Sequence, residues 1–500
     1  MTEGVLYFTI VFAPWAFGTT ERWSIWTMNV GGYVLGALLA AKWLIRWRSG
    51  YRQMRWTEAG AEETSNAEGK IPEAGRRTRG LGGRATIALG VLTVMTLAYC
   101  LISAVNARST FVYRQMAFEP LKHVSWLPHS YDRWATWQAF WMYLGLALTF
   151  WAARDWLLGK SGLERRPPKV PGRPSSESAA AGIGLPHAVF PTRLRRLLWV
   201  LCLNATLLSL EAILQRLSGT NKLLWQVQPA FNQYADLQFG PYSYRSNAAQ
   251  YFNLLWPVCL GFWWTLRRES RFAASGGSRL GAGSHVLLLP CAVLLAAAPI
   301  ISTSRGGALV SFAGMLTAAV MLSIADRRSR WPLRLGIVLL VAATLGLAAY
   351  LGWDKLSARL TKVFSDDLSG RVEIYRNAAE MARDFPVFGT GPGTFPWVYH
   401  LYRADARSEW AAYAHNDWLE TRITFGWVGS AMVAAMLLIV LIRSFGGGGI
   451  SAHWLFVSMF WLSLAGCLLH ARFDFPMQIC STLALFLLLC AALFCLSRKA

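Results

Sequence analysis

The residues best suited to chemistry in this chain are arginines that lie in short polar stretches between apolar runs. Arg245 lies in segment 242–247 (YSYRSN), Arg305 lies in segment 302–307 (STSRGG), and Arg371 follows a glycine. The guanidinium group is a planar fork of donors that matches a phosphate with two hydrogen bonds. Two or three such groups on one face of the molecule predict an anionic, phosphorylated ligand.

Arg305 gives the sharpest of these signals, because it lies between two apolar runs that leave almost no loop. An arginine embedded between membrane helices is costly, and such residues usually face a pathway or a partner. The glycines that follow it, Gly306 and Gly307, allow another group to approach the backbone closely. The alternative is that the side chain extends to the lipid headgroups. We favour a role in ligand binding.

His415 is the candidate general base, because an imidazole titrates near neutral pH. A histidine in a loop is usually a plain surface residue, but this one starts a His-Asn-Asp run just before an apolar block. Asn416 or Asp417 could orient its ring, and Asp474 lies in a second polar stretch with His470 and Arg472. No cluster has metal-ligand spacing, so we predict no metal site and no cofactor. The eight cysteines lie inside apolar runs without a CxxC pair, which favours core residues over disulfides.

The composition is that of a polytopic membrane protein. Hydrophobic residues make up 54% of the 500 residues and charged residues only 15%, whereas soluble proteins carry about 25% charged residues. The apolar residues form blocks of about 17–25, long enough to cross a hydrocarbon core about 30 Å thick. The formal charge of +22 could indicate nucleic-acid binding. Most basic residues lie in the connections, however, as the positive-inside bias predicts, so we expect no nucleic-acid partner.

We predict an all-α integral membrane fold with about twelve transmembrane helices. The predicted spans are 4–18, 24–46, 85–105, 135–157, 195–217, 248–266, 285–301, 306–325, 335–352, 424–442, 452–470 and 476–496. The basic connections are all even-numbered, so placing them in the cytoplasm puts both termini there as well. The odd-numbered connections, which carry the candidate site residues, then share the outer face.

Three outer connections are long, and they span 106–134, 218–247 and 353–423. Segment 106–134 is aromatic, and an interfacial belt is a simpler interpretation than a glycan platform. Segment 353–423 is too polar for lipid, and residues 370–384 within it have the pattern of a helix with Ser369 as N-cap. The glycines from Gly389 to Gly393 predict a tight backbone turn rather than a nucleotide loop, because the spacing differs and no strand precedes it.

These motifs, in this order, resemble the bacterial O-antigen ligase and polymerase superfamily of membrane glycosyltransferases. The resemblance covers most of the chain and is best from about residue 214 to 479. The matching words are PWAFGTT (14–20), QRLSGT (215–220), the Arg245/Asn247 segment, STSRGG (302–307), Gly370-Arg371, DFPVFGTGPGTF (384–395), HNDWLE (415–420) and DFP (474–476). One segment departs from the family pattern, because Tyr244-Arg245-Ser246-Asn247 stands where relatives often carry Asn-Arg-Asn or Asn-Pro-Asn-His.

The resemblance implies a helical fold of the class C glycosyltransferase type that uses neither metal nor nucleotide. It implies that Arg245 and Arg305 hold the pyrophosphate of an undecaprenyl-diphosphate donor, with help from Arg371. His415 would be the base that activates an acceptor hydroxyl. Asn247, Asn416, Asp417 and Asp474 would support the site.

The expected organisation follows from the spans and the resemblance. It comprises the first two spans (1–47), a disordered cytoplasmic loop (48–84), spans three and four with an aromatic periplasmic loop (85–157), a disordered basic cytoplasmic loop (158–194), spans five to nine (195–352), a periplasmic catalytic loop (353–423) and spans ten to twelve (424–500). The expected location is the bacterial inner membrane.

The expected activity is transfer of a glycan from undecaprenyl diphosphate to an acceptor at the periplasmic face. The acceptor could be lipid A-core, as for a ligase, or another lipid-linked glycan, as for a polymerase, and protein O-glycosylation is a third possibility. A transporter or lipid-linked glycan flippase with twelve spans is the alternative from another class. That class favours internal repeats and discontinuous helices, and the sequence shows no evident repeat.

Overall fold

The computed structural model describes residues 1–51, 73–161, 191–275, 284–325, 332–361, 368–403, 410–445 and 450–496. Most of the two segments predicted to be disordered, 48–84 and 158–194, lies outside these described residues. The described part of the first segment is helical from Glu73 onward, because the helix that contains the third predicted span begins there.

Helices dominate the described chain, and each of the twelve predicted spans falls on one of them. These helices are α1 (Thr2–Trp15), α2 (Arg22–Ser49), α4 (Glu73–Val105), α5 (Arg133–Leu158), α7 (Thr192–Ser218), α8 (Arg245–Ser275), α9 (Leu288–Ile301), α10 (Arg305–Ala325), α11 (Pro332–Thr361), α14 (Asp417–Phe445), α15 (Ile450–His470) and α16 (Cys480–Leu496). By length and composition, α2, residues Gly83–Val105 of α4, α7, α10 and α14 can cross a membrane, and shorter apolar stretches lie in α9, α11, α15 and α16.

Small residues let the helices approach one another closely, as is usual in membrane bundles. A side chain at Gly32 of α2 would lie 2.3 Å from the carbonyl oxygen of Gly145 in α5. Gly261 of α8 packs in the same way against Met459 of α15. A Cβ atom added to Gly261 would lie 2.9 Å from the Cβ of Met459. Helix α8 lies at the centre of the main core, with most of its residues from 246 to 266 buried.

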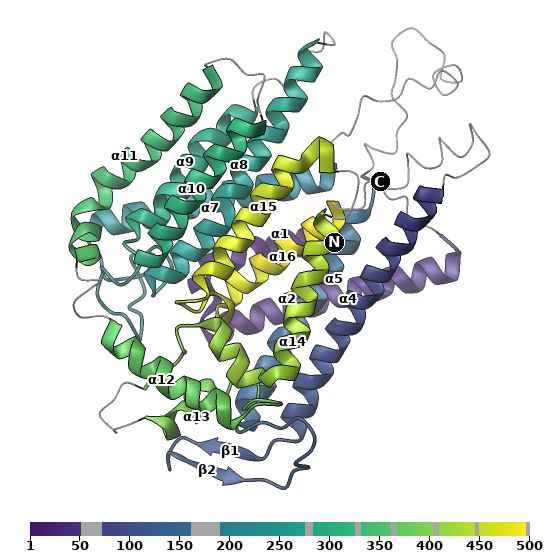
Figure 1. Cartoon of the computed structure of the whole chain (residues 1–500), viewed down its shortest axis with the longest axis vertical. Coiled ribbons are helices and arrows are strands. Elements are labelled where there is room, and N and C mark those ends of the chain that lie inside the picture. The colour runs from purple at the N-terminus through teal and green to yellow at the C-terminus, as the bar shows by residue number, and fades with distance from the viewer. Residues whose placement is uncertain are drawn as a thin grey trace.

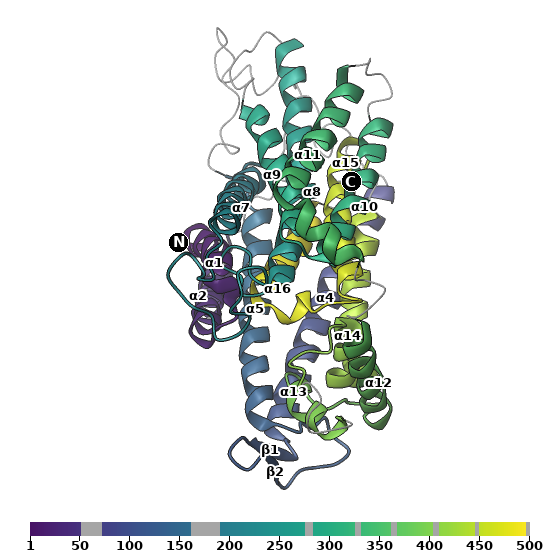
Figure 2. The same cartoon turned by 90° about the vertical axis from the view of Figure 1, so that its left-hand side faces the viewer.

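One end of the molecule carries the elements that do not belong to the bundle. Helix α12 (Leu368–Asp384), helix α13 (Phe395–Tyr399) and the antiparallel strands β1 (Ser109–Val112) and β2 (Ala117–Pro120) gather there (Figures 1 and 2). The helix predicted over 370–384 is confirmed, but the prediction of Ser369 as its N-cap is wrong, because the helix already begins at Leu368. The strands were not expected, and they place part of the aromatic 106–134 segment in a small hairpin.

The turn from Gly389 to Gly393 joins this end to the bundle. The amides of Thr390 and Gly391 donate to the carbonyl oxygens of Ile423 (2.8 Å) and Thr424 (3.0 Å) in α14. The backbone amide of Tyr131, in the aromatic segment, donates to the carbonyl oxygen of Thr390 at 2.9 Å. The tight backbone turn predicted here is confirmed, because Gly391 has φ +103°, a conformation that needs glycine.

The loop predicted over 353–423 is shorter in the structure than in the sequence pattern. Helix α11 continues to Thr361 and α14 already begins at Asp417, so both ends of the segment are helical. The polar ends of these helices extend past the apolar runs that mark the predicted spans. This geometry places His415 two residues before the start of α14.

Candidate active site

The short turn between α15 and the 3₁₀ helix η5 (Pro476–Gln478) is the centre of the candidate site. Its residue Asp474 has a side chain only 4% exposed. The Oδ1 atom of Asp474 lies 3.4 Å from Nδ1 of His415, and its Oδ2 atom lies 3.8 Å from Nε2 of His470. The hydroxyl of Ser246, at the start of α8, donates a hydrogen bond to Oδ2. Three distant parts of the chain thus meet on one carboxylate.

The surroundings of Asp474 favour its charged form. Burial alone would raise the pKa of this carboxyl, but His415, His470 and the Ser246 hydroxyl together hold it below its usual value. Asp474 is therefore ionised at neutral pH. A buried carboxylate against an imidazole orients the ring and stabilises its protonated form.

The backbone holds His415 in an unusual conformation, with φ +49°. Residues other than glycine rarely adopt positive φ, and the strain persists only where surrounding contacts enforce it. Here the hydroxyl of Tyr375 on α12 donates to the His415 carbonyl at 2.8 Å. The preceding amide, of Ala414, donates to Oε2 of Glu420 at 2.8 Å. The imidazole is thus positioned by both α12 and the first turn of α14.

Aromatic rings form one wall of the site around Phe475. Tyr413 stacks on Phe475 with ring centroids 4.2 Å apart, and Tyr244 also stacks on it at 5.4 Å. His415 meets the edge of Phe475 at 4.9 Å and 73°. These contacts shield the imidazole on one side, while 24% of the His415 side chain stays exposed.

The three predicted arginines lie on elements that border this turn, but their described contacts differ. Arg371 donates from Nη1 to the carbonyl of Phe473 at 3.0 Å. Arg305 begins α10, and its neighbour Gly306 is so close to the turn that an added carbon would lie 2.5 Å from the Phe473 ring and 2.8 Å from His470 Nε2.

Arg245 begins α8 directly before Ser246, which bonds the carboxylate of Asp474. Its own Nη1 donates to the carbonyl of Asp236 at 2.7 Å and lies 4.0 Å from the Asp236 carboxylate. The described contacts of the Arg245 guanidinium are thus with Asp236, in the loop before α8. Because Arg245 directly precedes Ser246, it lies at the end of α8 that meets the Asp474 turn.

The residues predicted to support the site have separate structural roles. Asn416 accepts from the amide of Leu419 at 3.2 Å and so caps α14. Asp417 accepts from the Met477 amide at 2.7 Å and from the Gln478 side chain at 3.0 Å. These contacts join both side chains to groups other than the imidazole, whereas the carboxylate of Asp474 lies 3.4 Å from Nδ1 of His415.

Asn247 is the fourth predicted supporting residue. It lies in the first turn of α8, its side chain is buried, and its carboxamide oxygen has no hydrogen-bond partner among the described residues. Among the same residues, no group of three or more His, Cys, Asp or Glu side chains could hold a metal ion. The eight cysteines are all free and buried.

Several residues of the site were missed from the sequence. Ser246, Tyr375, Tyr413 and the stacking of Tyr244 on Phe475 have no spacing signal, because each depends on how distant helices pack. Phe475 belongs to the DFP motif, and its position next to Asp474 was the one available clue.

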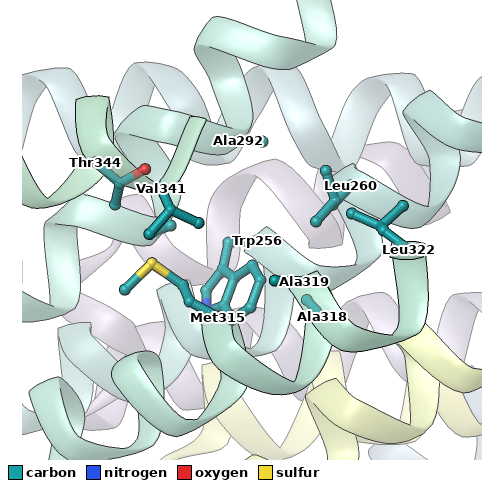
Figure 3. Close-up of a pocket in the computed structure, with 10 residues that line it drawn as sticks. Trp256, Leu260, Ala292, Met315, Ala318, Ala319, Leu322, Val341 and Thr344 are labelled. Carbon is teal, nitrogen blue, oxygen red and sulfur yellow. The ribbon is translucent and has the colours of Figure 1, made fainter. Parts of the chain in front are cut away.

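A separate apolar pocket lies away from this cluster, between α8, α9, α10 and α11 (Figure 3). Trp256, Met315 and Val341 point into it, and Thr344 is the one polar residue of its lining. Without a titratable side chain in its lining, this pocket offers no acid or base.

Comparison with curated proteins gives no match. Residues 290–434 match the family model described as O-antigen ligase. The matched segment runs from α9 into α14 and contains Arg305, Arg371 and His415, while Ser246 and Asp474 lie on either side of it. This match supports membership of the chain in the O-antigen ligase family.

Proposed function

We propose that the protein is a membrane glycosyltransferase that transfers a glycan from undecaprenyl diphosphate to an acceptor hydroxyl at the periplasmic face. The observation that carries the proposal is the contact between His415 and the buried, ionised Asp474, bordered by elements that bear three arginines. The family match supports a role in polysaccharide biosynthesis with a lipid-linked glycan and an acceptor as substrates.

The proposed reaction is a displacement at the anomeric carbon of the donor sugar. His415 has its Nδ1 turned to Asp474, so its other nitrogen, Nε2, accepts the proton of the acceptor hydroxyl. The acceptor oxygen forms a bond to the anomeric carbon, and the bond from that carbon to the phosphate oxygen breaks. The lipid diphosphate leaves with the electron pair. Asp474 stabilises the imidazolium that forms.

The arginines act on the leaving group in this proposal. Negative charge grows on the diphosphate oxygens as the glycosidic bond breaks, and fixed guanidinium groups in a partly dry site stabilise that charge. Arg305 and Arg371 border the Asp474 turn directly, and Arg245 approaches from the start of α8. The energy for the transfer is stored in the donor's phosphate linkage, so the reaction needs no nucleotide outside the cytoplasm.

The proposal includes twelve membrane crossings with both termini in the cytoplasm of the bacterial inner membrane. This arrangement puts the Asp474 turn, His415 and α12 on the outer side. The positive-inside distribution of Lys and Arg supports it. An acceptor on the outer face is then either lipid A-core, which makes the enzyme a ligase, or a second lipid-linked glycan, which makes it a polymerase.

The test uses the purified full chain with a lipid-linked glycan donor and two acceptors in parallel. Glycan transfer that is lost in His415→Ala supports the proposal, and the acceptor that is extended separates ligase from polymerase. Full transfer by His415→Ala would contradict the proposed base. In cells, donor that accumulates on the inner leaflet of the His415→Ala strain would instead favour a flippase.

A further inference from the structure

Building on the proposed function, we infer that Ser246 and His470 are positioning residues that hold the Asp474 carboxylate so that one oxygen faces His415. The two carboxylate oxygens have separate partners. Oδ1 lies 3.4 Å from His415 Nδ1 and accepts from the Phe475 amide at 3.1 Å. Oδ2 accepts from Ser246 and lies 3.8 Å from His470 Nε2.

Both positioning residues are almost completely buried. Ser246 is 4% exposed and His470 is 1% exposed. A carboxylate held on both oxygens cannot rotate about its χ2 angle without losing a charge-assisted hydrogen bond in a site of low dielectric. Its orientation toward the imidazole is therefore fixed from the inner side of the site, at atoms that no substrate can reach.

The hydroxyl of Ser246 is itself directed by a second serine. Ser304 Oγ donates to Ser246 Oγ at 3.2 Å, so the Ser246 oxygen acts there as an acceptor, and its own proton is donated to Asp474. Ser304 in turn accepts from the Gly307 amide at 3.1 Å. A chain of hydrogen bonds thus runs from the first turn of α10 through Ser304 and Ser246 to Asp474, whose Oδ1 lies 3.4 Å from Nδ1 of His415.

This chain begins beside Arg305, because Ser304 is the preceding residue. Consecutive buried hydrogen bonds thus join the segment proposed to hold the donor diphosphate to the carboxylate that faces the imidazole. Buried polar groups in such a network are costly unless every member is satisfied, which makes the geometry of the whole chain sensitive to one missing hydroxyl. The inferred role of Ser246 is to keep the base aligned while the arginine segment holds the donor.

The test measures kcat and the KM for the donor in purified Ser246→Ala and Ser246→Thr proteins. Loss of one hydrogen bond to a charged group predicts a fall in kcat of about 10- to 100-fold for Ser246→Ala. The donor KM should stay near that of the wild type, and Ser246→Thr should recover most of the rate. Ser463→Ala is the matched control, because this buried serine bonds the Leu254 carbonyl instead.

A double-mutant cycle separates positioning from general damage. If Ser246 acts through Asp474, adding Ser246→Ala to Asp474→Asn should cause little further loss of kcat. Additive losses would overturn the inference, as would an unchanged kcat in Ser246→Ala. If Ser246→Ala does not fold, His470→Leu and His470→Gln replace it, since only glutamine keeps a donor near the Nε2 position. Equal rates for those two variants would overturn the role of His470.

The outcomes for this inference and for the proposed function are distinct. Full transfer by His415→Ala contradicts the proposed base whatever the serine variants do. An inactive His415→Ala together with a fully active Ser246→Ala contradicts only the positioning role.

Discussion

Nδ1 of His415 lies 3.4 Å from Oδ1 of Asp474, although all of α14 and α15 separates the two residues in the chain. The distance is longer than a well-formed hydrogen bond, and such contacts often tighten when a substrate binds. The pair depends on the Asp417 amide, which donates to the carbonyls of Ala471 (2.8 Å) and Asp474 (3.2 Å) and holds the turn against α14.

Replacing Asp474 by asparagine should slow glycan transfer with little change in the fold. The amide keeps the volume of the carboxylate but cannot stabilise an imidazolium, so we expect a fall in kcat of about 10²-fold or more. Initial rates with the lipid-linked donor measure the effect, with the exposed Glu119→Gln on β2 as the control. A rate for Asp474→Asn within about twofold of the wild type would exclude an electrostatic role.

The lowered pKa of Asp474 also predicts a dependence of stability on pH. A carboxyl whose pKa is lower in the folded than in the unfolded state stabilises the fold above about pH 3.9, its unfolded value. That contribution is lost as the pH falls through the folded-state pKa. The gap in thermal midpoint between wild type and Asp474→Asn in detergent should therefore be constant above about pH 5 and shrink below about pH 4. A gap that widens on acidification would contradict the assignment.

Arg305→Lys should be a poor substitute for arginine. Lysine keeps the charge but loses the planar fork that binds a phosphate with two hydrogen bonds. We expect both Arg305→Lys and Arg305→Ala to reduce kcat/KM for the donor, by about 10-fold and 10²-fold or more respectively. The exposed Arg383→Ala on α12 is the control. Equal activity of Arg305→Lys and wild type would show that the fork is dispensable.

Gly306→Ala tests whether the Arg305 segment rests on the Asp474 turn. The added methyl group would lie 2.5 Å from the Phe473 ring and 2.8 Å from His470 Nε2, so one of them must move. We expect destabilisation of about 1–3 kcal/mol together with loss of transfer. Gly336→Ala in α11 is the matched control, because nothing lies within 4 Å of its added carbon. Equal thermal midpoints for the two variants would contradict the close approach.

The backbone at His415 predicts a difference between two inactive variants. Asparagine tolerates positive φ far better than a β-branched residue. We expect His415→Asn to keep the thermal midpoint of the wild type, while His415→Val should be about 1–2 kcal/mol less stable. Thermal unfolding of both proteins in detergent measures this, and equal stability would indicate that the loop relaxes its strain.

Much of the fold could be predicted because membrane helices are recognisable in a sequence as long apolar runs. Helix α12 was also predictable from its amphipathic pattern and from the Phe385-Pro386 pair that follows it. Strands β1 and β2 were not, because each has only four residues and their pairing depends on a turn without a strong signal.

The candidate site could be predicted only in part. Arg305 and His415 were identifiable because charged or titratable groups next to membrane spans are unusual. The partnership of His415 with Asp474 was not, because it requires α15 to pack on α8 and the Asp417 amide to hold the turn. Ser246 lies in the segment around Arg245, but its own role could not be predicted, since a serine beside an arginine is common and the role depends on Ser304, the residue before α10.

The boundaries of the family match have a practical consequence for chimaeras. Residues 290–434 contain His415 and Arg305, but the carboxylate and the hydroxyl that align the imidazole come from Asp474 and Ser246 outside that segment. Grafting the matched segment alone into a relative would therefore transfer His415 without the carboxylate and the hydroxyl that align its ring. Such a hybrid can work only where the recipient already supplies both groups, and otherwise the segments that carry Ser246 and Asp474 must be grafted as well.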